Sequence, residues 1–145
     1  MSDDIEARLK AAEAAVAELS SNFVEWIGDD MGKAKDSLKQ SQADIDNCAD
    51  NMLEFYNAIH NVKGLGGSFG YDLVTDVAES CCYLLKKTEQ RNAVVLKLCQ
   101  AHLSALDAII DRNVKGDGGA SGAAILTKLR DTVDATLTAL EQGKI

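Results

Sequence analysis

The stretch Met52–Gly70, MLEFYNAIHNVKGLGGSFG, decides the expected fold of this 145-residue chain. An advance of about 100° per residue gathers its apolar positions on one face, which is the pattern of an amphipathic α-helix. That inward face consists of Met52, Phe55, Ile59, Val62 and Gly66. His60 lies about 120° from the centre of this face, so we expect its ring on the flank of a helical domain, open to solvent and to a partner.

The chain before this stretch is also predicted to be helical. The protein has no proline and is rich in alanine, leucine, lysine and glutamate, which favours helices. We expect an N-terminal helix over about residues 3–40, capped by Ser2 or Asp3 and weakened at Gly28 and Gly32. Its apolar stripe consists of Ile5, Leu9, Ala12, Val16, Leu19, Phe23 and Trp26, and continues with Met31, Ala34 and Leu38.

Four further helices are expected over about residues 46–142. The first runs from about Asp46 to the glycines at 67–70, and the second is capped by Asp72 and stops near Lys87. The apolar stripe of the third consists of Val95, Leu98, Leu103, Leu106, Ile109 and Ile110. After a glycine-rich loop at 115–122, the stripe of the last consists of Ile125, Leu129, Val133, Leu137 and Leu140.

These patterns predict an all-α fold without strands. Amphipathic helices joined by short connections form an antiparallel four-helix bundle, with the additional N-terminal helix packed across or along it. A chain of this length supports one core, so we expect a single domain over residues 1–145.

The residues around His60 suit a histidine that carries an anionic group. Lys63 and Gly64 lie within about 60° of it, and Gly67 extends the side-chain-free surface by another turn. Each helical glycine costs about 0.8–1 kcal/mol relative to alanine, which is a sizeable share of a domain's stability. A nucleophile, a cation and open space together indicate phosphoryl transfer from an aspartyl phosphate in a partner's cleft.

Simpler explanations of the same residues stay open. An exposed histidine or lysine on a helix is usually only a solvated side chain, and glycines commonly mark the end of a helix. A nucleotide-binding loop is disfavoured, because the chain has no GxxxxGK[ST] motif, no GxGxxG motif and no expected strand.

The sequence around His60 resembles a histidine-containing phosphotransfer (HPt) domain. The resemblance consists of the motif HxVKG over His60–Gly64, a glycine ten residues after the histidine, Leu73, and a helix that ends in YLL at Tyr83–Leu85. The segment GSFGY at Gly67–Tyr71 is also similar to the phosphotransfer domain of chemotaxis histidine kinases. The specific match covers about thirty residues within Met52–Leu85. The rest of the chain agrees only in being helical and of suitable length.

The resemblance implies a four-helix bundle in which Nε2 of His60 accepts a phosphoryl group from an aspartate of a response-regulator receiver domain and returns it to another. It further implies that Lys63 stabilises the phosphoryl oxygens and that Gly64 and Gly67 make space for the receiver.

Receivers of this family dock on an apolar patch around the histidine, which here would include Leu53, Tyr56 and parts of the helix after residue 72. Many relatives hold the other ring nitrogen with a Gln or Glu twenty-two residues after the histidine. In this chain Cys82 takes that place, and a thiol is a poor hydrogen-bond partner. Glu79 or Asn57 would have to substitute; otherwise the imidazole tautomer is held less firmly.

The remaining candidates have simpler explanations. His102 is expected to be a partly buried, hydrogen-bonded side chain, because no Lys-Gly follows it, and Asp44–Cys48 lacks the glycine and glutamate of a calcium loop. Trp26 is expected in or capping the core; the near-heptad stripe of the first helix leaves dimerisation open as an alternative. Neither a metal nor a cofactor is expected, and the cysteines should be small buried side chains in a reducing compartment: Cys48, Cys81, Cys82 and Cys99.

Charge and hydropathy limit the partners and the location. The chain has 23 acidic against 15 basic residues and a net charge of −8, which argues against nucleic acid and anionic membrane as partners. No apolar run approaches the ~20 residues that span a bilayer, and the acidic start Met1–Asp4 is unlike a secretory signal. We therefore expect a cytoplasmic protein.

The sequence as a whole predicts a phosphorelay intermediate that partners receiver domains, a hybrid histidine kinase, or both. It would be a phosphocarrier and not an enzyme, because the chain has no ATP-binding motif. One alternative is a helical module that binds and regulates a receiver or kinase without being phosphorylated. Another is a chemotaxis-type phosphotransfer fragment labelled by a separate kinase core.

Overall fold

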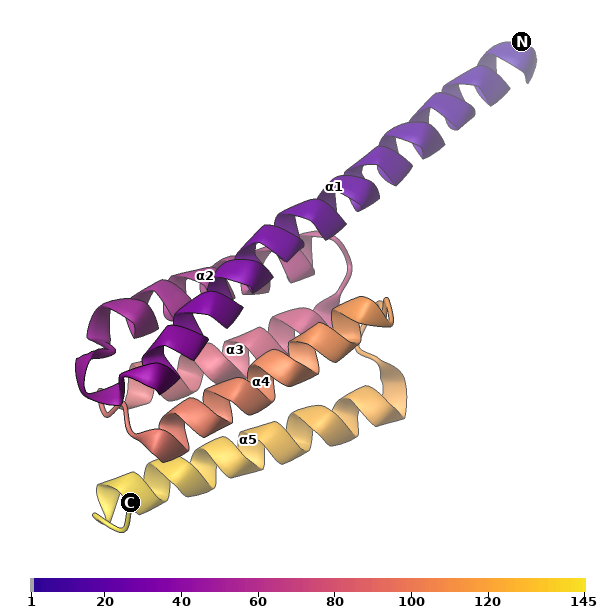
Figure 1. The fold of residues 1–145 in the computed structure, drawn as a ribbon. Coiled ribbons are helices and arrows are strands. Elements are labelled where there is room, and N and C mark those ends of the chain that lie inside the picture. The colour runs from indigo at the N-terminus through magenta and orange to yellow at the C-terminus, as the bar shows by residue number, and fades with distance from the viewer. Residues whose placement is uncertain (1) are drawn as a thin grey trace.

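The computed structural model describes residues 2–145, except for the side chains at positions 2 and 19–22. This part of the chain is all-α and contains no strand, which confirms the predicted class. Its five α-helices are α1 (Ser2–Ala43), α2 (Ala49–Ser68), α3 (Asp72–Lys87), α4 (Ala93–Asp111) and α5 (Gly119–Glu141), with a short 3-10 helix η1 (Ile45–Asn47) before α2 (Figure 1).

The helices pack side by side around one continuous core. The C-terminal part of α1 lies against α2 and α4, α3 lies against α2 and α4, and α5 lies against α3 and α4 (Figure 1). The inward face predicted for α2 is confirmed, since all of its members are buried: Met52, Phe55, Ile59, Val62 and Gly66. Burial of a large apolar side chain stabilises a fold by about 1.5–3 kcal/mol, so this face fixes the rotation of α2. His60 therefore projects outward and is exposed.

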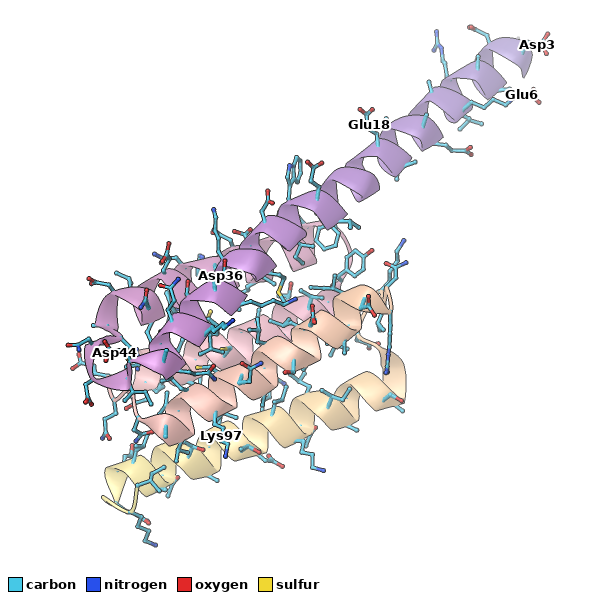
Figure 2. All side chains as sticks on the ribbon, viewed as in Figure 1. Asp3, Glu6, Glu18, Asp36, Asp44 and Lys97 are labelled. Carbon is cyan, nitrogen blue, oxygen red and sulfur yellow. The ribbon has the colours of Figure 1, made fainter. Side chains whose placement is uncertain are left out.

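Helix α1 is uninterrupted, because neither Gly28 nor Gly32 breaks it. Only its C-terminal part packs on the domain, through the buried residues Phe23, Ile27, Met31, Ala34 and Leu38. The N-terminal part projects away from the other helices (Figures 1 and 2). The predicted stripe is therefore exposed at Ile5, Leu9, Ala12 and Val16, and the side chain of Leu19 lies outside the described positions.

Trp26 lies at the edge of the core and not inside it. It is 45% exposed, whereas its neighbour Ile27 is fully buried. Phe23 sets this orientation, because its ring stacks on Tyr71 at 4.5 Å and lies 4.9 Å from Phe69, measured between ring centroids. The Trp26 ring then meets Phe69 edge-on at 6.2 Å.

Several helix boundaries differ from the prediction by a few residues. Asp46 lies within η1, so it does not cap α2, and Asp72 is the first residue of α3, which leaves Tyr71 at the cap position. Helix α5 already begins at Gly119, inside the predicted loop.

The inward face of α5 is also shifted from the predicted one. Ile125 is 42% exposed, because Gly122 and Leu126 take the inward positions at the start of the helix. The later part of the predicted face is confirmed at Val133 and Leu140, which are buried.

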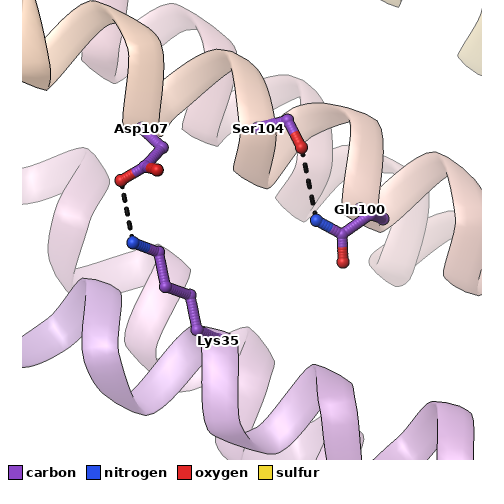
Figure 3. Close-up of polar contacts among 4 residues, drawn as sticks. All are labelled: Lys35, Gln100, Ser104 and Asp107. Atoms are coloured by element: carbon purple, nitrogen blue, oxygen red, sulfur yellow. Dashed lines mark hydrogen bonds and ion pairs between the residues drawn. The ribbon is translucent and has the colours of Figure 1, made fainter.

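One surface ion pair joins α1 to α4 (Figure 3). Lys35 Nζ donates to Asp107 Oδ1 at 2.8 Å, and on α4 itself Gln100 Nε2 donates to Ser104 Oγ at 3.2 Å (Figure 3). Both partners of the ion pair are roughly half exposed, so the pair stabilises the domain by at most about 1 kcal/mol. Apolar burial therefore holds α1 in place.

The interior contains the four cysteines, all buried and none in a disulfide, as predicted for small apolar side chains. Helix α4 is the one described helix that is long and apolar enough to cross a membrane by length and composition. Core helices meet the same criterion, and the apolar face of α4 is buried against its neighbours: Val95, Leu96, Leu98, Cys99, Leu103, Leu106 and Ile109.

Gly66→Ala is expected to destabilise the domain, although alanine is the better helix former. A methyl group at this position would lie 2.8 Å from Thr75 Oγ1, 3.0 Å from Val74 Cγ1 and 3.1 Å from the Thr75 backbone nitrogen. Helices α2 and α3 would have to move apart, and overpacking of this kind costs about 1–3 kcal/mol.

Gly64→Ala is the matched control, because nothing lies within 4 Å of its added methyl group. Its free energy of unfolding should rise by about 1 kcal/mol through helix propensity alone. Chemical denaturation of both variants measures the difference, and equal effects would contradict the close packing of α2 on α3.

Candidate functional site

His60 stands at the border of an open groove between α1 and α2. We call it the α1–α2 groove; its volume is about 580 Å³, and it is lined by Trp26, Asp29, Asp30 and Lys33 of α1 and by His60, Asn61, Gly64 and Leu65 of α2. Asn61 Nδ2 donates to Asp30 Oδ1 at 3.4 Å across the groove. A partner that reaches the His60 ring would therefore also meet α1.

The α1 side of this groove is missed by sequence reasoning. The α1 residues of the groove lie at positions i, i+3, i+4 and i+7, which places them on one helix face: Trp26, Asp29, Asp30 and Lys33. That spacing indicates a common face, but it does not indicate that the face borders a histidine thirty residues later in the chain.

Lys63 lies on the other side of His60, where α2 meets α3. Its backbone oxygen accepts a hydrogen bond from Thr75 Oγ1 at 2.8 Å, and its side chain is half-buried. Burial raises the pKa of the Cys82 thiol on α3, and the positive charge of Lys63 opposes this rise. On α2, Lys63 thus lies toward α3, whereas His60 borders the α1–α2 groove.

The three glycines after His60 have different surroundings. Gly66 is buried against α3 and is needed for packing, whereas a methyl group at Gly67 would make only an ordinary contact with Thr75 Oγ1 at 3.4 Å. At Gly64 nothing lies within 4 Å of an added methyl group. Packing therefore explains Gly66 but not Gly64, whose missing side chain leaves open surface beside His60.

The predicted docking residues lie on the turns before His60. Leu53 is 60% exposed, and the half-buried Tyr56 ring lies 6.2 Å from the His60 ring, between centroids. An apolar surface therefore adjoins the imidazole.

Comparisons of the chain with models of protein families, with curated proteins and with solved structures found no match.

The structure gives the His60 ring no hydrogen-bond partner among the described residues. Asn57 is exposed on α2, and Glu79 lies instead beside α5, where it lines a cavity of about 230 Å³ with Arg130 and Asp134. Cys82 is only 2% exposed, and its burial raises the pKa of its thiol to about 11, partly opposed by Lys63. At neutral pH Cys82 is therefore a buried thiol.

His102 is a structural residue of the core. It is completely buried; its Nδ1 donates to the Leu98 backbone oxygen at 2.8 Å, and its Nε2 accepts from Ser80 Oγ at 2.9 Å. The Leu98 carbonyl can only accept, so the neutral ring carries its proton on Nδ1. Burial lowers the pKa of His102, and the hydrogen bond to Leu98 opposes that shift. The predicted hydrogen-bonded histidine is confirmed, with deeper burial than expected.

The domain is expected to lose stability as the pH falls below about 6.5, the usual histidine pKa. The lowered pKa keeps folded His102 neutral while the unfolded chain takes up a proton, so protons favour unfolding until the folded pKa is reached. The loss approaches at most about 1.4 kcal/mol per pH unit. Denaturation at pH 7.5 and pH 5.5, values that bracket about 6.5, measures it.

The matched variants for this pH effect are His102→Gln and His60→Gln. His102→Gln should be less stable at neutral pH and should lose this pH dependence, whereas His60→Gln should keep it, because His60 is exposed. An unchanged pH dependence in His102→Gln would contradict the assignment.

Proposed function

We propose that the protein is a phosphorelay intermediate, in which His60 accepts a phosphoryl group from the aspartyl phosphate of a receiver domain and passes it to a second receiver. The observation that carries the proposal is the environment of His60: an exposed imidazole, open surface at Gly64, and Lys63 on the adjacent turn. Gly64 lowers the stability of the helix relative to alanine, and packing does not require it. Space for a partner beside His60 would explain why glycine is present there.

The proposed reaction is a direct displacement at phosphorus. The lone pair of His60 Nε2 forms a bond to phosphorus as the bond to the aspartyl oxygen breaks, and the carboxylate leaves with the bonding electrons. The ring proton stays on Nδ1 during the attack. The Lys63 ammonium stabilises the charge on the phosphoryl oxygens, and the reverse reaction on a second receiver regenerates the free imidazole.

The packing supports a four-helix bundle, with one change from the sequence-based expectation. Neighbour contacts link α1 to α2, α2 to α3, α3 to α4 and α4 back to α1. We infer that these four form the bundle and that α5, which lies against α3 and α4, is the additional helix in place of the N-terminal one.

We further propose that a receiver docks over Leu53, Tyr56 and the α1–α2 groove. Leu53 and Trp26 are exposed apolar side chains on either side of His60, which is the kind of residue that anchors protein interfaces. The proposed partners are receiver domains or a hybrid kinase in the cytoplasm, and the protein acts as a carrier that needs a phosphorylated donor.

Incubation with a phosphorylated receiver domain tests this function. A phosphorelay intermediate takes up label without ATP, whereas a regulatory binding module binds the receiver and stays unlabelled. A chemotaxis-type fragment would be labelled only by a kinase core with ATP and not by the receiver.

Lys63→Ala is expected to slow phosphoryl transfer by about tenfold or more, because it removes a charged contact worth about 1.5–3 kcal/mol in the transition state. The fold should persist, since the Lys63 side chain is only half-buried and lies off the inward face of α2. Single-turnover transfer from a phosphorylated receiver measures the rate. Lys97→Ala, an exposed lysine on α4, is the control and should transfer normally; an unchanged rate in Lys63→Ala would contradict the role of Lys63.

A further inference from the structure

The projecting part of α1 presents an apolar stripe that the rest of the domain does not cover. Ile5 and Leu9 are each 57% exposed and Val16 is 62% exposed. Over residues 3–18, side chains extend from the helix into solvent (Figure 2). The spacing 5, 9, 12 and 16 is the alternation of four and three that marks the contact positions of a coiled coil. A helical partner that covered this stripe would remove its apolar side chains from water and so stabilise the complex.

The domain itself limits how a partner can lie on this stripe. At about 100° per residue, Ile5, Leu9 and Val16 lie on the same helix face as Phe23. Phe23 is buried against Phe69 and Tyr71, so the domain occupies that face from Phe23 onward. A partner helix can therefore run along about residues 2–22, some 30 Å, before it meets the domain.

The charges beside the stripe define the chemistry of the partner. The carboxylates Asp3, Asp4, Glu6, Glu13 and Glu18 outnumber the cations Arg8 and Lys10 in this segment. Arg8 lies 3.7 Å from Asp4 of its own helix. Glu6 and Glu13, seven residues apart on one edge of the stripe, form no ion pair among the described residues.

We propose that the projecting part of α1 is a docking site for an amphipathic helix of another protein that carries lysine or arginine at seven-residue spacing along its apolar stripe. These cations would pair with Glu6 and Glu13, and the apolar stripe would cover Ile5, Leu9 and Val16. The inference is independent of phosphoryl transfer, because none of these residues borders His60.

Charge and space disfavour the other occupants of this face. In an antiparallel pair of identical chains, the edges with Glu6 and Glu13 face each other and repel. In a parallel pair, each domain occupies the space that the second α1 needs beyond Phe23. Anionic lipid is repelled by the excess of carboxylates.

Two synthetic helical peptides of about 21 residues test the proposal. Both have leucine at the contact positions. Beside these positions one peptide has lysine and the other has glutamate. The full chain should sediment as a monomer, and fluorescence anisotropy should show one-to-one binding of the lysine peptide at least about tenfold tighter than of the glutamate peptide. The preference should shrink in about 0.5 M NaCl. Vesicles of anionic lipid should not bind.

Three variants make the test specific. Leu9→Asp should weaken binding of the lysine peptide by about tenfold or more, and Ala7→Asp, on the opposite face, should not. The double variant Glu6→Lys with Glu13→Lys keeps good helix formers and should reverse the peptide preference. A dimer of the free chain, vesicle binding, equal affinity for the two peptides, or an unchanged preference in the double variant would overturn the proposal.

Discussion

Chains with His60→Gln are expected to take up no phosphoryl group from a phosphorylated receiver, the largest functional effect of any single change in this protein. Glutamine is similar in size and can form hydrogen bonds, but its amide nitrogen is no nucleophile, so no bond to phosphorus can form. Gel electrophoresis with radiolabelled receiver phosphate measures the loss.

The stability of His60→Gln is the control for this loss. The His60 side chain is exposed and outside the inward face of α2, so thermal unfolding of the variant should match the wild type within about 0.5 kcal/mol. His102 remains in the variant but is completely buried, so it cannot take over as acceptor. Full labelling of a folded His60→Gln chain would remove His60 from the mechanism.

The second large effect is expected from Gly64→Leu, which should lower transfer from a receiver by more than about tenfold while the domain becomes no less stable. Nothing lies within 4 Å of an added methyl group at this position, and Gly64 is exposed, so the rest of a larger side chain would extend into solvent. The leucine would fill the open surface beside His60 and hold a receiver away from the ring.

A small phosphodonor separates access from reactivity in Gly64→Leu. Phosphoramidate needs no docking surface, so it should label His60 in this variant nearly as well as in the wild type. Gly64→Ala is the graded control, with a smaller effect on receiver transfer. If receiver transfer proceeds normally in Gly64→Leu, Gly64 has no role in access.

The sequence predicts α2 well, because the whole length of that helix obeys one packing rule. Met52, Ile59 and Val62 repeat with the helical period and are all buried, which fixes the outward direction of His60 without knowledge of any other element. The exposure of His60 was thus predictable from local geometry alone.

The sequence predicts α1 less well, since an apolar stripe shows which face prefers burial but not what covers it. Ile5 and Phe23 belong to one stripe, yet only Phe23 reaches the aromatic rings of the α2–α3 connection. The other helices do not cover α1 at Ile5. The length over which they cover it depends on how α1 packs against the α2–α3 connection, which is distant in the sequence.

The candidate site also has one part that the sequence predicts and one part that it does not. His60, Lys63 and Gly64 lie on one helix, so their shared surface follows from spacing. The α1–α2 groove depends on how separate helices pack, and so does the position of Glu79 beside α5. Residue spacing within one helix could predict neither of them.

The most direct test of the account is to map the label by mass spectrometry after the folded chain has been incubated with a panel of phosphorylated receiver domains. We expect at least one receiver to transfer its phosphoryl group, and the label to lie on His60 alone. Uptake at another residue, or no uptake from any receiver by a folded chain, would contradict the proposal.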